Sequence, residues 1–215
     1  MSKTQIVVVP GAWHGPCYME SVASKLEALG YTVQCQQMPA VGSSDSPRDL
    51  SADIAALRSM VEKAIDTDRD VVVVCHSWGG TVTSNGLVGL SATERQHQGQ
   101  KGGVDKFCYA VDPHILYNDL PVDEQRFWFA KLQSHVYATL HDKATAATWK
   151  TIPTSYLLCE EDAALVPAAQ QAFIHAARDK GADVDVTRIK AGHSPFLSKV
   201  DETVEWIVGV AGRAK

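Results

Sequence analysis

Short hydrophobic runs alternate with longer segments of helical periodicity along most of the chain. Several runs are rich in β-branched residues and apolar at nearly every position, which is typical of parallel strands covered on both faces. The runs are Ile6–Val9, Thr32–Gln37, Val71–Cys75, Lys106–Val111, Ser155–Cys159 and Val184–Ile189. Helical patterns between them cover residues 16–29, 51–65, 79–90, 167–179 and 198–210. This alternation predicts right-handed βαβ units and an α/β fold with a doubly wound, mainly parallel sheet of about six strands.

Two segments depart from this alternation. Residues 91–103 are strongly polar (SATERQHQGQKGG), and we expect a solvated surface loop there. Residues 112–153 contain no strand pattern but many aromatic residues, with short amphipathic helices expected at 123–132 and 134–140. Such an insertion within a single domain spanning residues 1–215 is a candidate lid, in which Phe127 and Trp128 would contact a substrate. Alternatively, its aromatic side chains simply pack the insertion onto the body.

Composition narrows the class of protein. The chain has 215 residues, of which 45% are hydrophobic, and a formal net charge of −5. These values exclude a disordered protein and disfavour binding to nucleic acid. No apolar run is long enough to span a bilayer, and the N-terminal residues lack the pattern of a secretory signal, so we expect a cytoplasmic protein. The five cysteines show no metal-site spacing, and we expect buried free thiols and no metal.

The most informative motif follows the third hydrophobic run. The sequence VVVVCHSWGG, residues 71–80, predicts a buried strand, a tight turn at Ser77 and then a helix. A strand–nucleophile–helix turn needs small residues two positions before and after the nucleophile, here Cys75 and Gly79. Such a turn exposes the Ser77 hydroxyl and leaves the Trp78 N–H at a helix N-terminus, where it can stabilise a developing negative charge.

A serine hydroxyl needs a general base, and eight histidines compete for that role. We favour His193, because it follows the last strand in the sequence KAGHSP and Gly192 allows the loop to reach back over the sheet edge. The others lie in loops or in the insertion, within a helix, or beside the serine. They are His14, His76, His97, His114, His135, His141 and His175.

A carboxylate must then orient the histidine and stabilise its protonated form. Asp162 is our first candidate, because it leaves the end of the penultimate strand in the sequence CEEDAALVP. Asp112, after the preceding strand, and Glu160 and Glu161, beside Asp162, remain alternatives.

The loop after the first strand, VPGAWHG, completes the expected site. Gly11 and Gly15 allow a close approach of the backbone, and the Ala12 N–H is our candidate for the second oxyanion donor. We expect Trp13 and His14 to line the substrate pocket, although His14 could instead steady the loop. Neither a phosphate-binding GxxxxGK[ST] spacing nor a GxGxxG spacing is present, so no cofactor is expected.

Together these motifs make the chain similar to the α/β-hydrolase superfamily. It resembles in particular small single-domain bacterial and fungal hydrolases related to plant methyl-ester esterases and hydroxynitrile lyases. The resemblance runs through PGAWHGP, CHSWGG, LYNDLP, YLLCEEDAALVP and AGHSPFLSKVDE. It implies an α/β-hydrolase fold with a short helical cap, a Ser77–His193–Asp162 triad, an oxyanion hole formed by Ala12 and Trp78, and no cofactor.

Three departures from relatives stand out. Pro10 replaces a histidine that is common in relatives, and Cys75 replaces the first elbow glycine. The stretch between residues 111 and 116 is also shorter than in relatives, which would leave the pocket more open or its wall to another subunit.

The sequence therefore predicts an enzyme acting on a small molecule. The first hypothesis is a serine hydrolase that cleaves a small apolar or aromatic carboxylic ester or lactone through an acyl-enzyme. The second is a lyase or C–C bond-cleaving enzyme that uses the same triad on a hydroxynitrile or polyketide-like substrate. The third is a binding protein whose catalysis has decayed. A homodimer is plausible because a short cap would expose aromatic side chains.

Overall fold

The computed structural model describes residues 4–44, 47–65, 69–97, 103–109 and 116–213. Six strands form one sheet in the order β2-β1-β3-β4-β5-β6, and every neighbouring pair is parallel. The predicted α/β class with a mainly parallel sheet is therefore confirmed. The strands are β1 (Gln5–Val9), β2 (Thr32–Cys35), β3 (Asp70–Cys75), β4 (Gly103–Tyr109), β5 (Thr154–Cys159) and β6 (Val184–Ile189).

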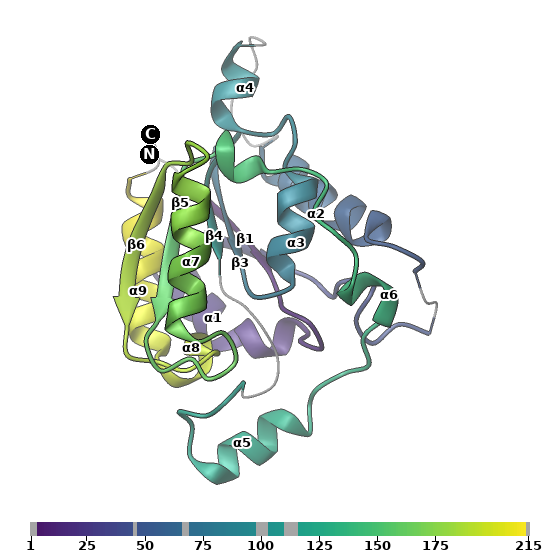
Figure 1. Ribbon diagram of the computed structural model, residues 1–215, viewed down its shortest axis with the longest axis vertical. Helices are drawn as coiled ribbons and strands as arrows, with labels where there is room; N and C mark the ends of the chain where they lie inside the picture. The colour runs from purple at the N-terminus through teal and green to yellow at the C-terminus, as the bar shows by residue number, and fades with distance from the viewer. Residues whose placement is uncertain (1–3, 45–46, 66–68, 98–102, 110–115, 214–215) are drawn as a thin grey trace.

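Helices cover both faces of this sheet (Figure 1). Alternate side chains of β1 enter two separate cores, because successive residues of a strand point to opposite faces. Val7 and Val9 pack with Leu57 of one helix layer, whereas Ile6 and Val8 pack on the other side. The helical segments are η1 (Pro16–Met19), α1 (Glu20–Ala28), α2 (Ser51–Ile65), α3 (Gly79–Gly86), α4 (Ala92–His97), α5 (Val122–Phe129), α6 (Tyr137–Leu140), η2 (Thr148–Lys150), α7 (Pro167–Arg178), α8 (Pro195–Ser198) and α9 (Val200–Ala211).

Helix ends follow the local sequence closely. The first predicted helix divides into η1 and α1, and Gly30 follows it with φ +85°, the left-handed conformation that glycine adopts without strain. Gly181 follows α7 in the same conformation. β2 ends two residues earlier than predicted, at Cys35, and the Gln37 side chain instead donates to the carbonyl of Val41 in the loop that follows.

The expectation of a loop over residues 91–103 was partly wrong, because α4 forms at its start. The Ser91 hydroxyl oxygen accepts from the Glu94 N–H at 3.1 Å, and a Glu94 carboxylate oxygen accepts from the Ser91 N–H at 3.3 Å. This reciprocal pair is a capping box, which satisfies backbone donors at a helix start. The rest of the stretch, residues 98–102, lies outside the described residues.

Candidate active site

The turn between β3 and α3 has the strained backbone that the CHSWGG motif predicts, but Ser77 is buried at 5% exposure rather than exposed. Ser77 adopts a positive φ of 52°, which a non-glycine residue takes only when its surroundings enforce it. A Cβ on Gly79 would lie 2.6 Å from the Pro10 carbonyl oxygen and 2.8 Å from that of Val9. Glycine at position 79 therefore lets the start of α3 touch the end of β1, and this contact holds the turn at the carboxyl edge of the sheet.

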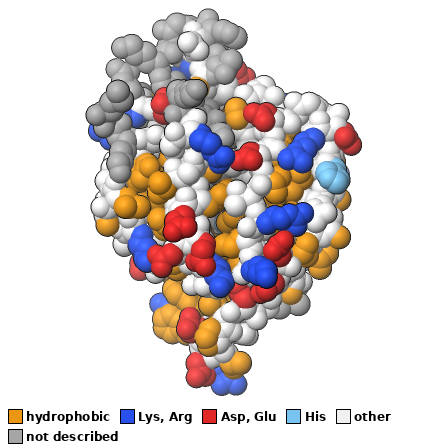
Figure 2. All heavy atoms as spheres, turned by 90° about the vertical axis from the view of Figure 1, so that its left-hand side faces the viewer, with side chains coloured by type: hydrophobic (Ala, Val, Ile, Leu, Met, Phe, Trp, Pro, Cys, Tyr) orange, Lys and Arg blue, Asp and Glu red, His pale blue; other side chains and the backbone are white. Residues whose placement is uncertain are grey.

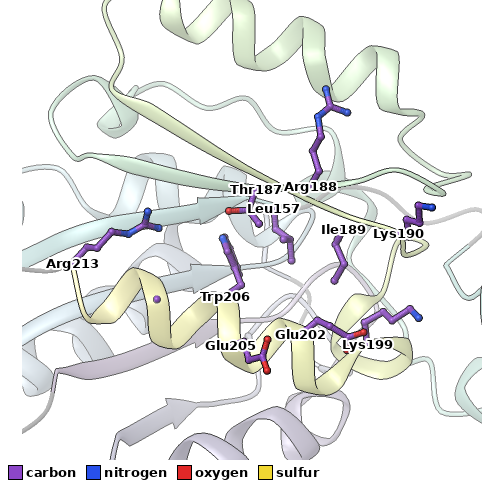
Figure 3. A pocket seen from close by; sticks show the side chains of 11 residues that line it. Leu157, Thr187, Arg188, Ile189, Lys190, Lys199, Glu202, Glu205, Trp206 and Arg213 are labelled. Atoms are coloured by element: carbon purple, nitrogen blue, oxygen red, sulfur yellow. The ribbon is translucent and has the colours of Figure 1, made fainter.

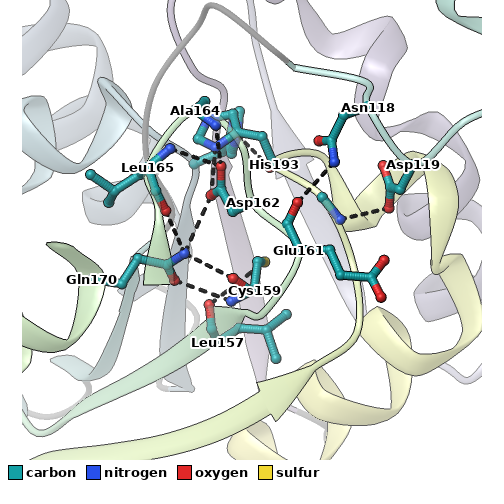
Figure 4. Close-up of polar contacts among 12 residues, drawn as sticks. Asn118, Asp119, Leu157, Cys159, Glu161, Asp162, Ala164, Leu165, Gln170 and His193 are labelled. Atoms are coloured by element: carbon teal, nitrogen blue, oxygen red, sulfur yellow. Dashed lines mark hydrogen bonds and ion pairs between the residues drawn. The ribbon is translucent and has the colours of Figure 1, made fainter. Parts of the chain in front are cut away.

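His193 and Asp162 form a buried pair at the same edge. The Nδ1 atom of His193 lies 2.9 Å from Oδ2 of Asp162, and Oδ1 of Asp162 accepts the backbone N–H groups of Ala164 and Leu165 at 2.8 Å each (Figure 4). These two bonds orient the carboxylate, so Nδ1–H of His193 can donate to it. The sequence prediction that the loops after β5 and β6 bring these two side chains together agrees with this geometry.

The other ring nitrogen of His193 does not contact the carboxylate. Its Nε2 atom is buried and makes no hydrogen bond within the described part of the chain, so the expected bond to the Ser77 hydroxyl is not formed in this structure. His76, the residue before Ser77, lies against this loop, since its Nε2 is 3.3 Å from the carbonyl oxygen of His193. The nucleophile turn and the histidine loop are therefore neighbours. Burial lowers the pKa of His76 well below its usual value, which keeps the ring neutral and able to donate to that carbonyl.

Gln170 is a polar residue of this site that sequence reasoning missed. It is buried in α7, where its Nε2 donates to the carbonyls of Cys159 at 2.9 Å and Leu165 at 2.7 Å, and lies 3.5 Å from Oδ2 of Asp162. Its Oε1 accepts the Cys159 N–H at 3.1 Å. One side chain thus fastens both ends of the loop that carries Asp162. A glutamine in a helix gives no sequence signal for such a role.

The alternative acids do not share this position. Glu160 is exposed and pairs with Arg188 at 3.3 Å, and Glu161 is also exposed. Asp112 lies outside the described residues.

The loop after β1 packs directly against the nucleophile turn. A Cβ on Gly11 would lie 2.4 Å from Nδ1 of His76 and 3.0 Å from Cβ of Ser77. Among contacts between described residues, neither the Ala12 N–H nor the Trp78 N–H is used in a hydrogen bond. The two N–H groups expected to bind an oxyanion therefore lie on loops that are in contact with each other.

His14 lies beneath this loop rather than on its surface. The ring is buried, Nδ1 lies 2.6 Å from the Ala12 carbonyl oxygen, and Nε2 lies 2.9 Å from the Tyr117 hydroxyl. Burial lowers its pKa to about 4, so the neutral ring can donate from Nδ1 and accept at Nε2. With both nitrogens engaged, the His14 geometry matches the loop-steadying alternative rather than substrate contact.

Trp13 is held from the cap side. Its backbone has a φ of +65°, and its N–H donates to Nδ1 of His135 at 3.2 Å. The His135 ring also packs edge-on against Trp78 at 4.5 Å between centroids. Burial lowers the pKa of His135 to about 4, which keeps Nδ1 free to accept. His135 is thus a second residue of the site that spacing alone did not reveal.

The aromatic residues of the insertion divide into two groups. Trp128 packs on Tyr18, whose hydroxyl donates to the Trp128 carbonyl at 2.9 Å. Phe127 and Phe129 in the same helix are 55% and 68% exposed. Figure 1 shows α5 beyond the end of the sheet, apart from the helices that cover its faces. Contact of Phe127 or Trp128 with a substrate stays a prediction.

Two hollows lie away from Ser77, Asp162 and His193. A groove of about 690 Å³ runs between β6 and α9 (Figure 3), and Figure 2 shows side chains of both charges interspersed on this face. A small apolar cavity of about 50 Å³ lies behind the nucleophile turn. Neither is lined by Ser77, Asp162 or His193. The groove is lined by Leu157, Thr187, Arg188, Ile189, Lys190, Lys199, Glu202, Glu205, Trp206, Gly209 and Arg213.

The sequence pattern of the alpha/beta hydrolase family matches residues 6–206. The chain belongs to this family. It is 27% identical to the alpha/beta hydrolase nvfD of Aspergillus novofumigatus over 252 aligned positions, which cover 100% of this chain and 99% of the relative. Because this chain has 215 residues, at least 37 of those positions (252 − 215) have no counterpart here.

Solved structures show the same fold at low sequence identity. The Arabidopsis methylesterase MES16 superposes with a TM-score of 0.77 at 14% identity, over 97% of this chain and 99% of that one. Tomato methylketone synthase I, solved with 2-tridecanone, gives 0.74 at 13% identity over 100% of both chains. The resemblance to the branch of plant methyl-ester esterases is therefore confirmed at the level of fold.

The described residues contain neither a membrane-spanning helix nor a cluster of metal ligands. No helix among them has the length and apolar character needed to cross a bilayer. No three His, Cys, Asp or Glu side chains among them are grouped so as to hold a metal ion.

Proposed function

We propose that this chain is a serine hydrolase that cleaves a small apolar or aromatic carboxylic ester or lactone. Ser77 attacks the carbonyl carbon while Nε2 of His193 takes the hydroxyl proton, and the resulting imidazolium is stabilised by Asp162. The observation that carries the proposal is the buried His193–Asp162 pair, in which Nδ1 of His193 lies 2.9 Å from Oδ2 of Asp162, on a loop that contacts His76 beside Ser77.

The developing oxyanion would be stabilised by the N–H groups of Ala12 and Trp78, which need no reorganisation because their loops are packed against each other. Protonated His193 then gives its proton to the leaving alcohol, and the acyl group remains on Ser77. In the second half-reaction His193 activates a water molecule, which attacks the acyl-enzyme and releases the acid. A neutral His76 beside the pair adds no positive charge that would oppose protonation of His193.

The test is hydrolysis of short p-nitrophenyl esters by the wild-type protein and two serine variants. Ser77→Ala should lower kcat by on the order of 10⁴-fold or more. Ser155→Ala is the matched control, because Ser155 is buried in β5 and its hydroxyl makes no hydrogen bond among the described residues. Equal hydrolysis by the wild-type protein and Ser77→Ala would refute the proposal.

Mass spectrometry during turnover separates hydrolysis from a lyase reaction with the same triad. A hydrolase accumulates an acyl adduct on Ser77 when deacylation is slow, whereas acid–base catalysis by His193 alone leaves the protein mass unchanged. We expect the acyl adduct.

A further inference from the structure

Residues 117–119, near the start of the predicted cap (residues 112–153), contact three separate loops of the proposed site. The Tyr117 hydroxyl bonds His14 in the loop after β1 at 2.9 Å. The Asn118 side-chain amide donates to the Glu161 carbonyl at 2.8 Å, in the loop that carries Asp162 (the acid loop). A carboxylate oxygen of Asp119 accepts the Gly192 N–H at 2.7 Å, in the loop that carries His193 (the histidine loop). Figure 4 shows Asn118 and Asp119 reaching these two loops from the segment above them. The segment belongs to the LYNDLP motif, to which the proposed mechanism gives no role.

Gly192 lies very close to the side chains of Asn118 and Asp119. A Cβ at position 192 would lie 2.5 Å from Oδ1 of Asn118 and 2.5 Å from Oδ1 of Asp119. The two side chains therefore occupy the volume that any larger residue would need. A side chain at position 192 would require Asn118 and Asp119 to move, so glycine permits this contact with the cap.

The turn formed by residues 117–120 is fixed in position by core packing. Leu116, Tyr117 and Leu120 are buried in the core cluster that also contains Phe196 of α8. The Leu120 N–H closes the turn on the Tyr117 carbonyl at 3.0 Å. Burial raises the pKa of the Tyr117 hydroxyl, which stays protonated and able to donate to His14. Because its neighbours are packed in the core, Asp119 cannot follow the histidine loop if that loop shifts.

We propose that Asp119 is a positioning residue for His193, acting through the N–H of Gly192, and that Asn118 does the same for the acid loop through Glu161. The inference rests on the proposed function. Hydrogen bonds to charged acceptors are short and strong, and the contact here lies one residue from the general base. A misplacement of about 1 Å at a catalytic group can cost on the order of 10²-fold in rate.

Asp119→Ala and Asp119→Asn test this with a matched control. Asp142 is also a cap aspartate that accepts a distant backbone N–H, from Leu50 at 3.1 Å, but Leu50 belongs to none of the three loops of the site. We expect Asp119→Ala to lower kcat by on the order of 10²-fold with KM within about 3-fold. Asp119→Asn, which keeps an acceptor oxygen, should stay within about 5-fold of wild type, and Asp142→Ala within about 2-fold. Urea unfolding confirms that each variant is folded under the assay conditions.

Labelling by a fluorophosphonate probe distinguishes failure of the proposed function from failure of the proposed role of Asp119. A wild-type protein that the probe does not label overturns the proposed function and this inference with it. A labelled wild-type protein with equally fast labelling of Asp119→Ala overturns the inference alone. Equal losses in Asp119→Asn and Asp119→Ala also overturn it, because the hydrogen-bond acceptor would then not be the cause. If Asp119→Ala does not fold, Asp119→Ser replaces it, since serine suits turns but is too short to reach the Gly192 N–H.

Discussion

Replacing Gly79 with alanine should separate the nucleophile turn from β1. The new Cβ would lie 2.6 Å from the Pro10 carbonyl oxygen, whereas real Cβ contacts stay above 3.0 Å, so the two segments must part by at least 0.4 Å (3.0 − 2.6). Both obstructing oxygens are main-chain atoms at the end of an interior strand, which cannot rotate away. Overpacking of this kind costs about 3 kcal/mol, and a better helix former recovers about 1 kcal/mol. We therefore expect the free energy of unfolding to fall by about 2 kcal/mol.

Gly209→Ala is the matched control for this prediction. Gly209 lies in α9, and a Cβ there meets no atom within 4 Å. The same substitution should thus raise the free energy of unfolding by about 0.5–1 kcal/mol through helix propensity alone.

Urea unfolding, followed by tryptophan fluorescence and far-UV circular dichroism, measures both variants. We expect the two midpoints to shift in opposite directions and the m-value to stay constant. Labelling by a fluorophosphonate should also slow in Gly79→Ala, because the displaced turn carries Ser77. A Gly79→Ala protein as stable as Gly209→Ala would refute the contact between the turn and β1.

Two further predictions follow from buried groups. Burial lowers the pKa of His14 from 6.5 to about 4, so the unfolded chain binds a proton there first, and the free energy of unfolding should fall as the pH drops from 6.5 to 4. The full shift corresponds to about 3 kcal/mol. Urea unfolding at pH 7 and pH 4.5 measures the loss, and the free energy of unfolding should depend less on pH in His14→Gln than in the wild-type protein. An equal pH dependence in the two proteins would contradict the assignment of this loss to His14. Burial also raises the pKa of the buried Cys159 thiol, so iodoacetamide at pH 8 should alkylate this thiol only after unfolding. Rapid alkylation of Cys159 in the folded protein, detected by peptide mass, would show that this thiol is accessible.

Strands and helices could be predicted because their sequence patterns report local burial. The apolar run of β3 and the stripe of α2 each appear in the structure at nearly the predicted bounds. The order of strands in the sheet could not be read this way, because it depends on contacts between distant segments. α4 was missed although its signal, Ser91 followed by Glu94, was present in the sequence.

The residues of the candidate site also fall into those that the sequence predicts and those that it does not. Ser77, Asp162 and His193 each follow a strand, and the carboxyl ends of parallel strands share one edge, so topology alone predicts that they meet. Gln170, His135 and Asp119 form hydrogen bonds with backbone N–H or carbonyl groups of other loops. Such contacts depend on where a loop lies in space, and no residue spacing encodes them.

The most direct test of the central claim is to locate the residue that a fluorophosphonate modifies. Because only an activated serine reacts readily, peptide mapping of the treated wild-type protein should place the adduct on Ser77, and His193→Ala should slow its formation by orders of magnitude. An adduct on another serine, or labelling of Ser77 at the same rate without the His193 imidazole, would contradict the claim that this histidine activates the hydroxyl.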